Sequence, residues 1–428
     1  MKKILASILA AISVLSLAGC GENPVSPKTS DTASNPVDTS DPAAITHERK
    51  NFAPIEITGD NVLNSVRVFD TMYEDNKQAM FSPLSLNMCL GMVEAGADGD
   101  TKKALDAYLG STDYAAFAED YLAHSKDFNV KVNNDYAKYQ NVFEIANSFW
   151  ANKNLKFNSD YQKRVSTSFA AEIENLDFSK SDKAADKING WVNKKTHEMI
   201  PSIVLPSMLS EDTAAVLVNT VYFESAWDDE WYVPEEKKKF TNLDGSTTEL
   251  ELMFKGGNSY FENDNATAFS CRYKNGMQFI GILPKKDGDF TLESLDLNSL
   301  LESESFKYDV RARMPKLNFE SSFPLTEALK AAGLEVAFDP DTADFTPMQG
   351  SDDELFYISD VLQKTKLELD DEGTRAAAAT AAIITNAAEA FDPTPPEIKE
   401  VFLDRPFAFL IYDDAAEQIV FMGKVTAM

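Results

Sequence analysis

The chain has 428 residues, of which 44% are hydrophobic, and its formal net charge is −29. This acidity argues against nucleic-acid binding, because phosphate contacts need clustered Lys or Arg. The main basic run, Lys237–Lys239, directly follows two glutamates. The acidity instead fits a solvated, exported surface.

Residues 1–19 read as a signal peptide. Two lysines precede an apolar run, Ile4–Leu17, which is too short to span a membrane comfortably. The sequence Leu-Ala-Gly-Cys at Leu17–Cys20 resembles the cleavage box of bacterial lipoproteins. That resemblance implies export, lipidation of Cys20 and anchoring to the bacterial envelope, with Gly21 favouring the outer membrane or cell surface. An ordinary signal peptide with an incidental cysteine is the alternative.

Residues 20–54 are expected to form a lipidated, flexible tether. Residues 21–46 are rich in Pro, Ser, Thr and Asp and nearly free of large apolar side chains. Such a segment cannot bury enough apolar surface to offset the entropy lost on ordering. We therefore expect the membrane contact to be made by the N-terminal lipid alone.

The chain becomes globular from about residue 55 and shows no later linker, repeat or shift in composition. Its length alone would favour two domains. Cys89 and Cys271 could pair in an exported protein, but their apolar and strand-like surroundings favour buried, unpaired thiols. The continuous apolar run Ala214–Tyr222 suits a strand buried on both faces, and Ile188–Thr196 suits an amphipathic helix.

Residues 368–391 combine two conflicting signals. Five of the six residues 376–381 are alanine, which favours a helix. Yet positions 374, 376, 378, 380 and 382 are all small, so a strand of this sequence could slide between two others without meeting the core. Three prolines within 392–396 end either structure. We predict an exposed loop whose first half is compatible with a strand that it need not be using.

Several stretches together resemble the serpin family, and in particular its inhibitory members. The run Asp371–Thr380 resembles the hinge of their reactive loop, and two later runs resemble the family's C-terminal signature. The other similar stretches follow in the family's order. All of these stretches are Met80–Leu86, Phe223–Trp227, Phe279–Pro284, Met314–Leu317, Asp371–Thr380, Asp404–Ile411 and Phe421–Val425.

The resemblance implies an α+β fold: one large serpin domain over residues 55–428. Its central, mostly antiparallel sheet would be flanked by helices and joined by two further sheets and an exposed reactive-centre loop. Met80–Leu86 would open a helical segment that continues to Thr101. Leu355–Asp371 would form the strand beside the gap in the central sheet into which the cleaved loop inserts.

The resemblance also implies a function, that of a suicide substrate for serine proteases. The protease would cut the loop, and insertion of its hinge would trap the acyl-enzyme. We expect a monomer. The hinge would comprise Asp371, Glu372, Gly373, Thr374, Arg375, Ala376, Ala377, Ala378, Ala379 and Thr380, and the insertion gate Ser82, Ser85, Asn219, Gln363 and Trp227.

Two positions depart from the family pattern. Arg375 stands where glutamate is common in the family. Because side chains alternate along a strand, Arg375 of an inserted hinge would point toward solvent. Gln363 stands where histidine is frequent; glutamine can still donate and accept hydrogen bonds but does not titrate.

The bond that the protease would cut is expected to follow Ala387, with Ala388 after it. A small apolar residue there suits an elastase-like or subtilisin-like protease, and chymotrypsin-like enzymes are a further candidate. The loop is longer than in many serpins, so Thr385, Asn386 or Ala388 could also be the bait residue.

Two other classes of function fit the sequence less well than a protease inhibitor. An enzyme is disfavoured, because none of the common catalytic, phosphate-binding or metal-binding motifs occurs and the three histidines, His47, His124 and His197, lie in polar surroundings. We therefore expect no catalytic residue, cofactor or metal. A non-inhibitory serpin-like binding or scaffold module is the alternative, and the hinge favours the inhibitor.

Overall fold

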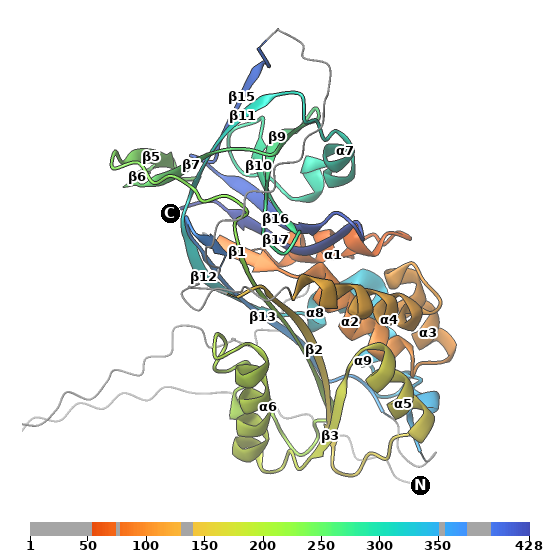
Figure 1. Ribbon diagram of the computed structural model, residues 1–428. Helices are drawn as coiled ribbons and strands as arrows, with labels where there is room; N and C mark the ends of the chain where they lie inside the picture. The colour runs from red at the N-terminus through yellow and green to blue at the C-terminus, as the bar shows by residue number, and fades with distance from the viewer. Residues whose placement is uncertain (1–53, 74–77, 130–139, 351–355, 375–394) are drawn as a thin grey trace, which may run out of the picture. The chain divides into compact units, whose positions relative to one another are not determined.

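The computed structural model describes residues 54–73, 78–129, 140–350, 356–374 and 395–428. Within these ranges, helices accompany two sheets of six strands, one of three and one of two. Figure 1 shows these elements with their labels. The α+β fold with a large, mostly antiparallel sheet and further sheets is confirmed.

Several helices begin at residues that can satisfy their free N–H groups. The Asp60 carboxylate accepts two main-chain N–H groups at the start of α1, and Ser82 accepts the N–H of Ser85 at the start of α2. Pro83 takes the first position of α2, where no N–H is needed. The α-helices are α1 Asn61–Met72, α2 Pro83–Glu94, α3 Gly99–Leu109, α4 Tyr114–His124, α5 Ser159–Ser168, α6 Ser181–Lys195, α7 Leu297–Glu302, α8 Thr326–Leu329 and α9 Glu335–Phe338; shorter helical turns are η1 Ser125–Phe128, η2 Pro206–Met208, η3 Glu293–Leu295, η4 Lys330–Leu334 and η5 Thr346–Met348.

The strands follow the same chain order. They are β1 Gln78–Phe81, β2 Val142–Asn152, β3 Glu172–Leu176, β4 Ala215–Ala226, β5 Lys238–Thr241, β6 Thr247–Leu250, β7 Leu252–Gly256, β8 Ser259–Glu262, β9 Ala266–Arg272, β10 Gln278–Pro284, β11 Asp309–Pro315, β12 Leu317–Pro324, β13 Asp360–Leu369, β14 Gly373–Thr374, β15 Ile398–Phe402, β16 Phe407–Asp413 and β17 Gln418–Val425.

Two expected elements have different bounds. Met80 and Phe81 belong to β1, which pairs with β17, and the helix begins only after the Ser82 cap. The helical segment is also divided, because α2 ends at Glu94 and α3 begins at Gly99. The strand expected over 355–371 is β13, Asp360–Leu369, which a turn at Asp370 ends.

The sheet with strand order β12-β13-β14-β4-β2-β3 frames the candidate site. Most of its neighbouring strands run antiparallel; β2 with β3, and β13 where it meets β4 directly, run parallel. Ala215–Thr220 of β4 is buried without interruption, as the apolar run predicts.

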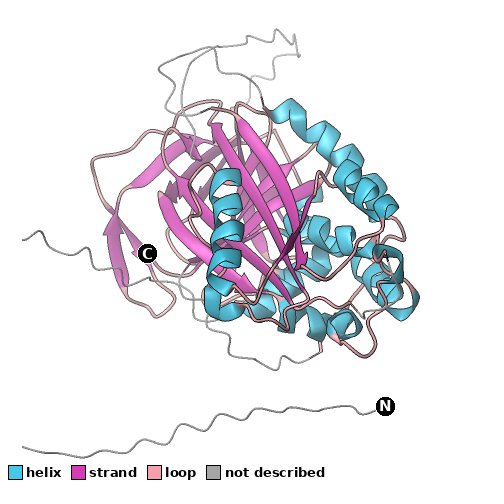
Figure 2. Cartoon of the chain, turned by 90° about the horizontal axis from the view of Figure 1, so that it is seen from below, coloured by secondary structure: helices cyan, strands magenta, loops and turns pink. Residues whose placement is uncertain are grey.

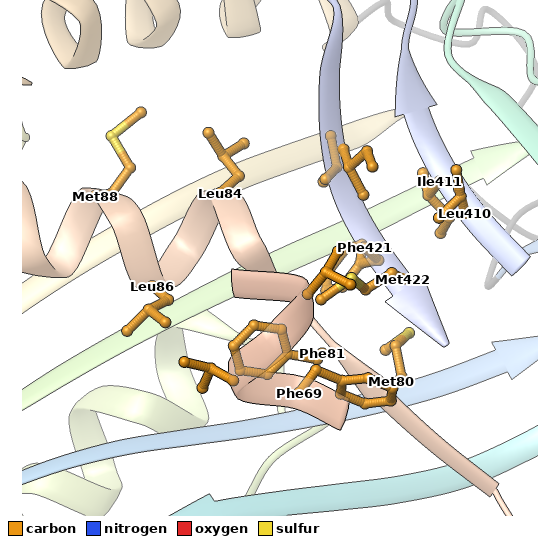
Figure 3. Packing of buried hydrophobic residues seen from close by; sticks show 14 of the residues in the cluster. Phe69, Met80, Phe81, Leu84, Leu86, Met88, Leu410, Ile411, Phe421 and Met422 are labelled. Carbon is orange, nitrogen blue, oxygen red and sulfur yellow. The ribbon is translucent and has the colours of Figure 1, made fainter. Parts of the chain in front are cut away.

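Two apolar clusters cover this sheet. The smaller one joins Trp150 of β2 and Val218 of β4 to Ile188 and Trp191 of α6. The larger one contains α2 and the sheet of β1, β16 and β17, and Figure 3 shows its packing around Phe69, Phe81 and their neighbours. Figure 1 shows α6 on one side of β2 and β3, with α5 and α9 on the other.

In the view from below, most helices lie to one side of the strands (Figure 2). Across the described ranges, none of them is long and apolar enough to span a membrane. Cys89 and Cys271 are both buried and unpaired, as expected from their surroundings. Burial raises the pKa of each thiol to about 12.

Candidate functional site: a gap in the large sheet

The candidate site begins where the hinge meets the large sheet. Gly373 and Thr374 form β14, which pairs with Leu369 of β13 on one side and with Ser225 and Ala226 of β4 on the other. Thr374 is only 3% exposed. Gly373 and Thr374 therefore already use the strand-compatible chemistry that the sequence predicts, and at these two residues the stretch is buried rather than exposed.

A turn at Asp370 directs the chain back into the sheet. Its Oδ1 accepts the N–H groups of Glu372 and Gly373, at 3.0 and 3.2 Å, and its own N–H donates to the carbonyl of Gly373 at 2.8 Å. Aspartate favours such turns because its short side chain reaches the backbone two residues on. Lys316 forms an ion pair with Asp371 beside it.

Tyr273 receives the first inward side chain of the hinge. Its hydroxyl lies 2.5 Å from Oγ1 of Thr374, and its ring stacks on Trp227 with centroids 4.3 Å apart and planes 13° apart. Burial raises the pKa of Tyr273 well above its usual value, so the hydroxyl stays neutral and can donate or accept. Tyr273 was not among the predicted site residues, because it carried no signal in the sequence apart from its aromatic type.

Trp227 lies beside the hinge, as the family resemblance implies. Its indole Nε1 donates to the carbonyl of Asp370 at 2.9 Å, and its N–H donates to the carbonyl of Glu372 at 3.2 Å. The N–H of Trp231 donates to the carbonyl of Asp371 at 3.1 Å. Two tryptophans of one segment therefore hold the turn that precedes β14.

Ser82 and Gln363 join the start of α2 to β13. The side chain of Gln363 accepts the N–H of Ser82 at 2.8 Å and donates to its carbonyl at 3.0 Å. The Ser82 hydroxyl donates to the carbonyl of Val420 at 2.7 Å. Gln363 is 3% exposed, so both of its bonds are formed away from water.

Ser85 and Asn219 form the matching connection to β4. The hydroxyl of Ser85 donates to Oδ1 of Asn219, whose Nδ2 donates to Oδ1 of Asn147 on β2 at 2.5 Å. Sequence reasoning missed Asn147, although a polar residue within the apolar stretch 145–151 was a usable signal. The structure thus gathers Ser82, Ser85, Asn219 and Gln363 around the first turn of α2, whereas Trp227 lies at the hinge.

A gap separates β13 from β4 between these two groups of contacts. The strands pair directly only at Asp360–Leu362 with Val216–Val218, and β14 separates them at the far end. The six residues Gln363–Glu368 and the six residues Asn219–Glu224 therefore face each other without pairing.

A pocket occupies this gap. Residues 221–223 of β4 and residues 366–368 of β13 line its sides, and Thr374 lies at one end. Met80, Ile411 and Phe421 line it from the core, where Figure 3 shows all three side chains. Residues Thr196, Met199 and Ile200, which follow α6, complete the lining.

The remaining predicted site residues lie outside the described residues. They are Cys20 of the lipidation site, Arg375, Ala376, Ala377, Ala378, Ala379 and Thr380 of the hinge, and Thr385, Asn386, Ala387 and Ala388 around the predicted cleavage site. Among the side chains that the structure describes, no group of three or more His, Cys, Asp or Glu could hold a metal ion.

Known proteins resemble this chain over nearly all of its described length. Residues 63–428 match the family model described as "Serpin (serine protease inhibitor)". A serpin-like protein of Methanosarcina acetivorans is 28% identical, with 92% of each chain covered. Leukocyte elastase inhibitor A of Mus musculus is 27% identical, covering 86% of this chain and 99% of its own.

A solved structure agrees with these similarities. The native crystal structure of tengpin, a thermophilic serpin, aligns with a TM-score of 0.72 and 28% identity, covering 89% of this chain and 98% of its own. The family match covers more than half of the chain, and the solved serpin structure shares its fold. This chain belongs to the serpin family of serine protease inhibitors.

Proposed function

We propose that this protein inhibits serine proteases as a suicide substrate. A protease would cut the loop at about Ala387–Ala388, its serine forming an ester with the carbonyl of Ala387 while Ala388 leaves as the new amine. The freed hinge would then insert into the gap of the large sheet. The observation that carries this proposal is the six-residue gap between β4 and β13, at one end of which Gly373 and Thr374 already lie as a strand.

The register of β14 says how the hinge would continue. Extended by one residue at a time, it pairs Arg375 with Glu224 and Glu368, and Thr380 with Asn219 and Gln363. Arg375–Thr380 would thus fill the gap without breaking any existing pair of strands. Further insertion would have to separate Asp360–Leu362 from β4.

The alternation of side chains supports the same direction of insertion. Thr374 points into the core, where it meets Tyr273, so Ala376, Ala378 and Thr380 would point there too. All three are small enough to enter beneath a packed sheet. Arg375 would point away from the core, so its charge would not have to be buried.

The Ser82–Gln363 and Ser85–Asn219 contacts would then act as a gate. They tie β13 and β4 separately to the start of α2 and so hold the two strands at the width seen here. A strand that inserts past Thr380 would have to move these anchors. Because none of the four residues titrates near neutral pH, the gate itself would not respond to pH.

The proposed target protease and the proposed location in the cell rest on the sequence and on a similar protein. Alanine at the bait position suits a protease with a shallow pocket, and one similar protein is named as an elastase inhibitor. We therefore propose an elastase-like or subtilisin-like target, with chymotrypsin-like enzymes as further candidates. Lipidation at Cys20 would anchor the inhibitor to the bacterial envelope.

A direct experiment tests the proposal. The purified protein is mixed with an elastase-like, a chymotrypsin-like and a subtilisin-like protease and run on a denaturing gel. We expect a covalent adduct with at least one of them, and mass spectrometry of the released C-terminal fragment would identify the cut bond. Cleavage without any adduct, across all three proteases, would favour the non-inhibitory module instead.

A further inference from the structure

The turn that follows α6 lies over the gap. Thr196, Met199 and Ile200 line the pocket opposite the core side chains, between β4 and β13. Met199 and Ile200 are 8% and 3% exposed and belong to the smaller apolar cluster between α6 and the sheet. A strand inserting between β4 and β13 would occupy the space that these side chains border, so the turn would have to shift.

This turn carries two strained residues. His197 and Glu198 have φ angles of 49° and 67°, in the left-handed region that non-glycine residues rarely adopt. The N–H of Glu198 donates to the carbonyl of Asn193 at 2.8 Å, and that of His197 to the carbonyl of Lys194 at 3.3 Å. This is a common end of a helix, but its first left-handed position is normally glycine. Strain of this kind suggests that the side chain has a role.

The imidazole of His197 fastens the turn to two strands. Its ring lies on that of Tyr222 in β4, with centroids 4.3 Å apart and planes 31° apart. Its Nε2 lies 3.1 Å from Oε2 of Glu144 in β2. Tyr222 lines the gap and its hydroxyl donates to Glu224, so His197 holds the turn at the edge where a new strand would pair.

The charges around His197 are mostly negative. Glu144 faces it from β2, and Glu224 from β4 through Tyr222. Lys366 and Glu368 of β13, which line the same pocket, pair with each other at 3.1 Å. Within the turn and the end of α6 lie Lys194, Lys195 and Glu198, of which Lys195 pairs with Glu172 at 2.6 Å. Among these groups, Glu144 is the one that the imidazole contacts directly.

We propose that His197 is a positioning residue that latches the turn Thr196–Ile200 over the gap and slows strand insertion. This inference rests on the proposed function. The latch acts on the turn beside Tyr222, whereas the gate contacts lie around the first turn of α2.

The test compares variants with the wild type at the same pH, so that the protease's own pH dependence cancels. His197→Asn removes the latch but keeps a residue that tolerates the left-handed conformation. Glu144→Gln removes only the charge opposite the imidazole. Glu172→Gln is the matched control, because it removes a carboxylate bound to the same helix through Lys195, in a pair that does not involve Tyr222 or β4.

The readout is the rate of covalent adduct formation at saturating protease. We expect both latch variants to be about two- to fivefold faster than wild type, the range that an exposed polar pair can produce. Equal rates for wild type and both latch variants, or the same increase in Glu172→Gln, would overturn the latch.

A second measurement needs no protease. The amides of Met199 and Ile200 are bonded to the carbonyl and the hydroxyl of Thr196, at 2.9 and 3.1 Å, so their hydrogen exchange reports opening of the turn. We expect faster exchange of both amides in His197→Asn. If the wild type forms no adduct with any protease, the proposed inhibitory function fails, and unchanged exchange in this variant would reject the latch separately.

Discussion

The hydroxyls of Tyr273 and Thr374 lie 2.5 Å apart in the core, 101 residues apart in the chain. This contact fixes which side of the hinge faces inward. It also shows that the sheet has already accepted the first two residues of the strand that would insert.

Replacing Thr374 with Arg should abolish adduct formation while leaving the protein cleavable. A guanidinium beside Tyr273 would be buried without a partner, at a cost of several kcal/mol, so β14 should leave the sheet instead. Thr374→Val is the control: it keeps the size of the side chain and adds no charge, at a cost of about 1–3 kcal/mol for leaving the buried Tyr273 hydroxyl without this partner. Gel assays with the same protease compare them. A Thr374→Arg protein that traps protease as well as wild type would rule out insertion.

Cutting the loop should raise the unfolding temperature. Insertion of Arg375–Thr380 would add main-chain hydrogen bonds to both β4 and β13, each worth about 0.5–1.5 kcal/mol. The summed free energy of these hydrogen bonds corresponds to a rise in the unfolding temperature on the order of 10 °C or more. Calorimetry of the intact and the nicked protein checks this. Nicked Thr374→Arg is the control, and its unfolding temperature should not rise. Identical melting of the intact and nicked wild type would contradict the stored-energy mechanism.

Gln363→Ala should destabilise the sheet. It leaves the N–H of Ser82 without its partner in a buried place, at about 1–3 kcal/mol, while the carbonyl of Ser82 still accepts the N–H of Leu86. Gln363→His should keep both bonds near pH 8, where the neutral ring donates and accepts, and lose one when protonated. Its folded-state pKa is then depressed, so stability should fall as pH drops through about 6.5. The wild type should show no such step.

Asp70 should make stability depend on pH in the opposite sense. Burial raises its pKa from 3.8 to about 6, although its carboxylate accepts the N–H groups of Leu292 and Glu293. The folded protein therefore takes up this proton before the unfolded chain does. Relative to Asp70→Asn, the wild type should gain about 2–3 kcal/mol as pH falls from 6 toward 4 and lose it again on return. If the melting temperatures of the wild type and Asp70→Asn change in parallel from pH 4 to 7.5, the pKa of Asp70 is not raised.

The two buried thiols should be inert in the folded protein. Because burial raises the pKa of Cys89 and Cys271 to about 12, thiolate is scarce at pH 8 and reagents cannot reach it. We expect no labelling by a maleimide until the protein unfolds, and no change in melting temperature with a reducing agent. Labelling of either residue in the native state would show that its surroundings open. Cys20 is replaced by Ser for this test, so that only these two thiols remain.

Much of the local structure could be read from the chain. The apolar run in β4, the helix over residues 188–195, the buried cysteines and the small alternating residues of the hinge all follow from side-chain type and spacing. The family resemblance also named Ser82, Ser85, Asn219 and Gln363 before their contacts were seen. The predicted bounds of α2 and β13 differ from those in the structure, because a cap at Ser82 begins α2 and a turn at Asp370 ends β13.

What the sequence determined by itself is the chemistry of the hinge, since small side chains at every second position suit a buried strand wherever they are placed. Only the tertiary structure decided that Thr374 is already in the sheet, that Asn147 joins the polar contacts, and that His197 reaches Glu144 and Tyr222. These contacts join residues 25 to 101 positions apart. Such contacts depend on how strands and helices pack across the whole domain, and no local pattern of residue types specifies that packing.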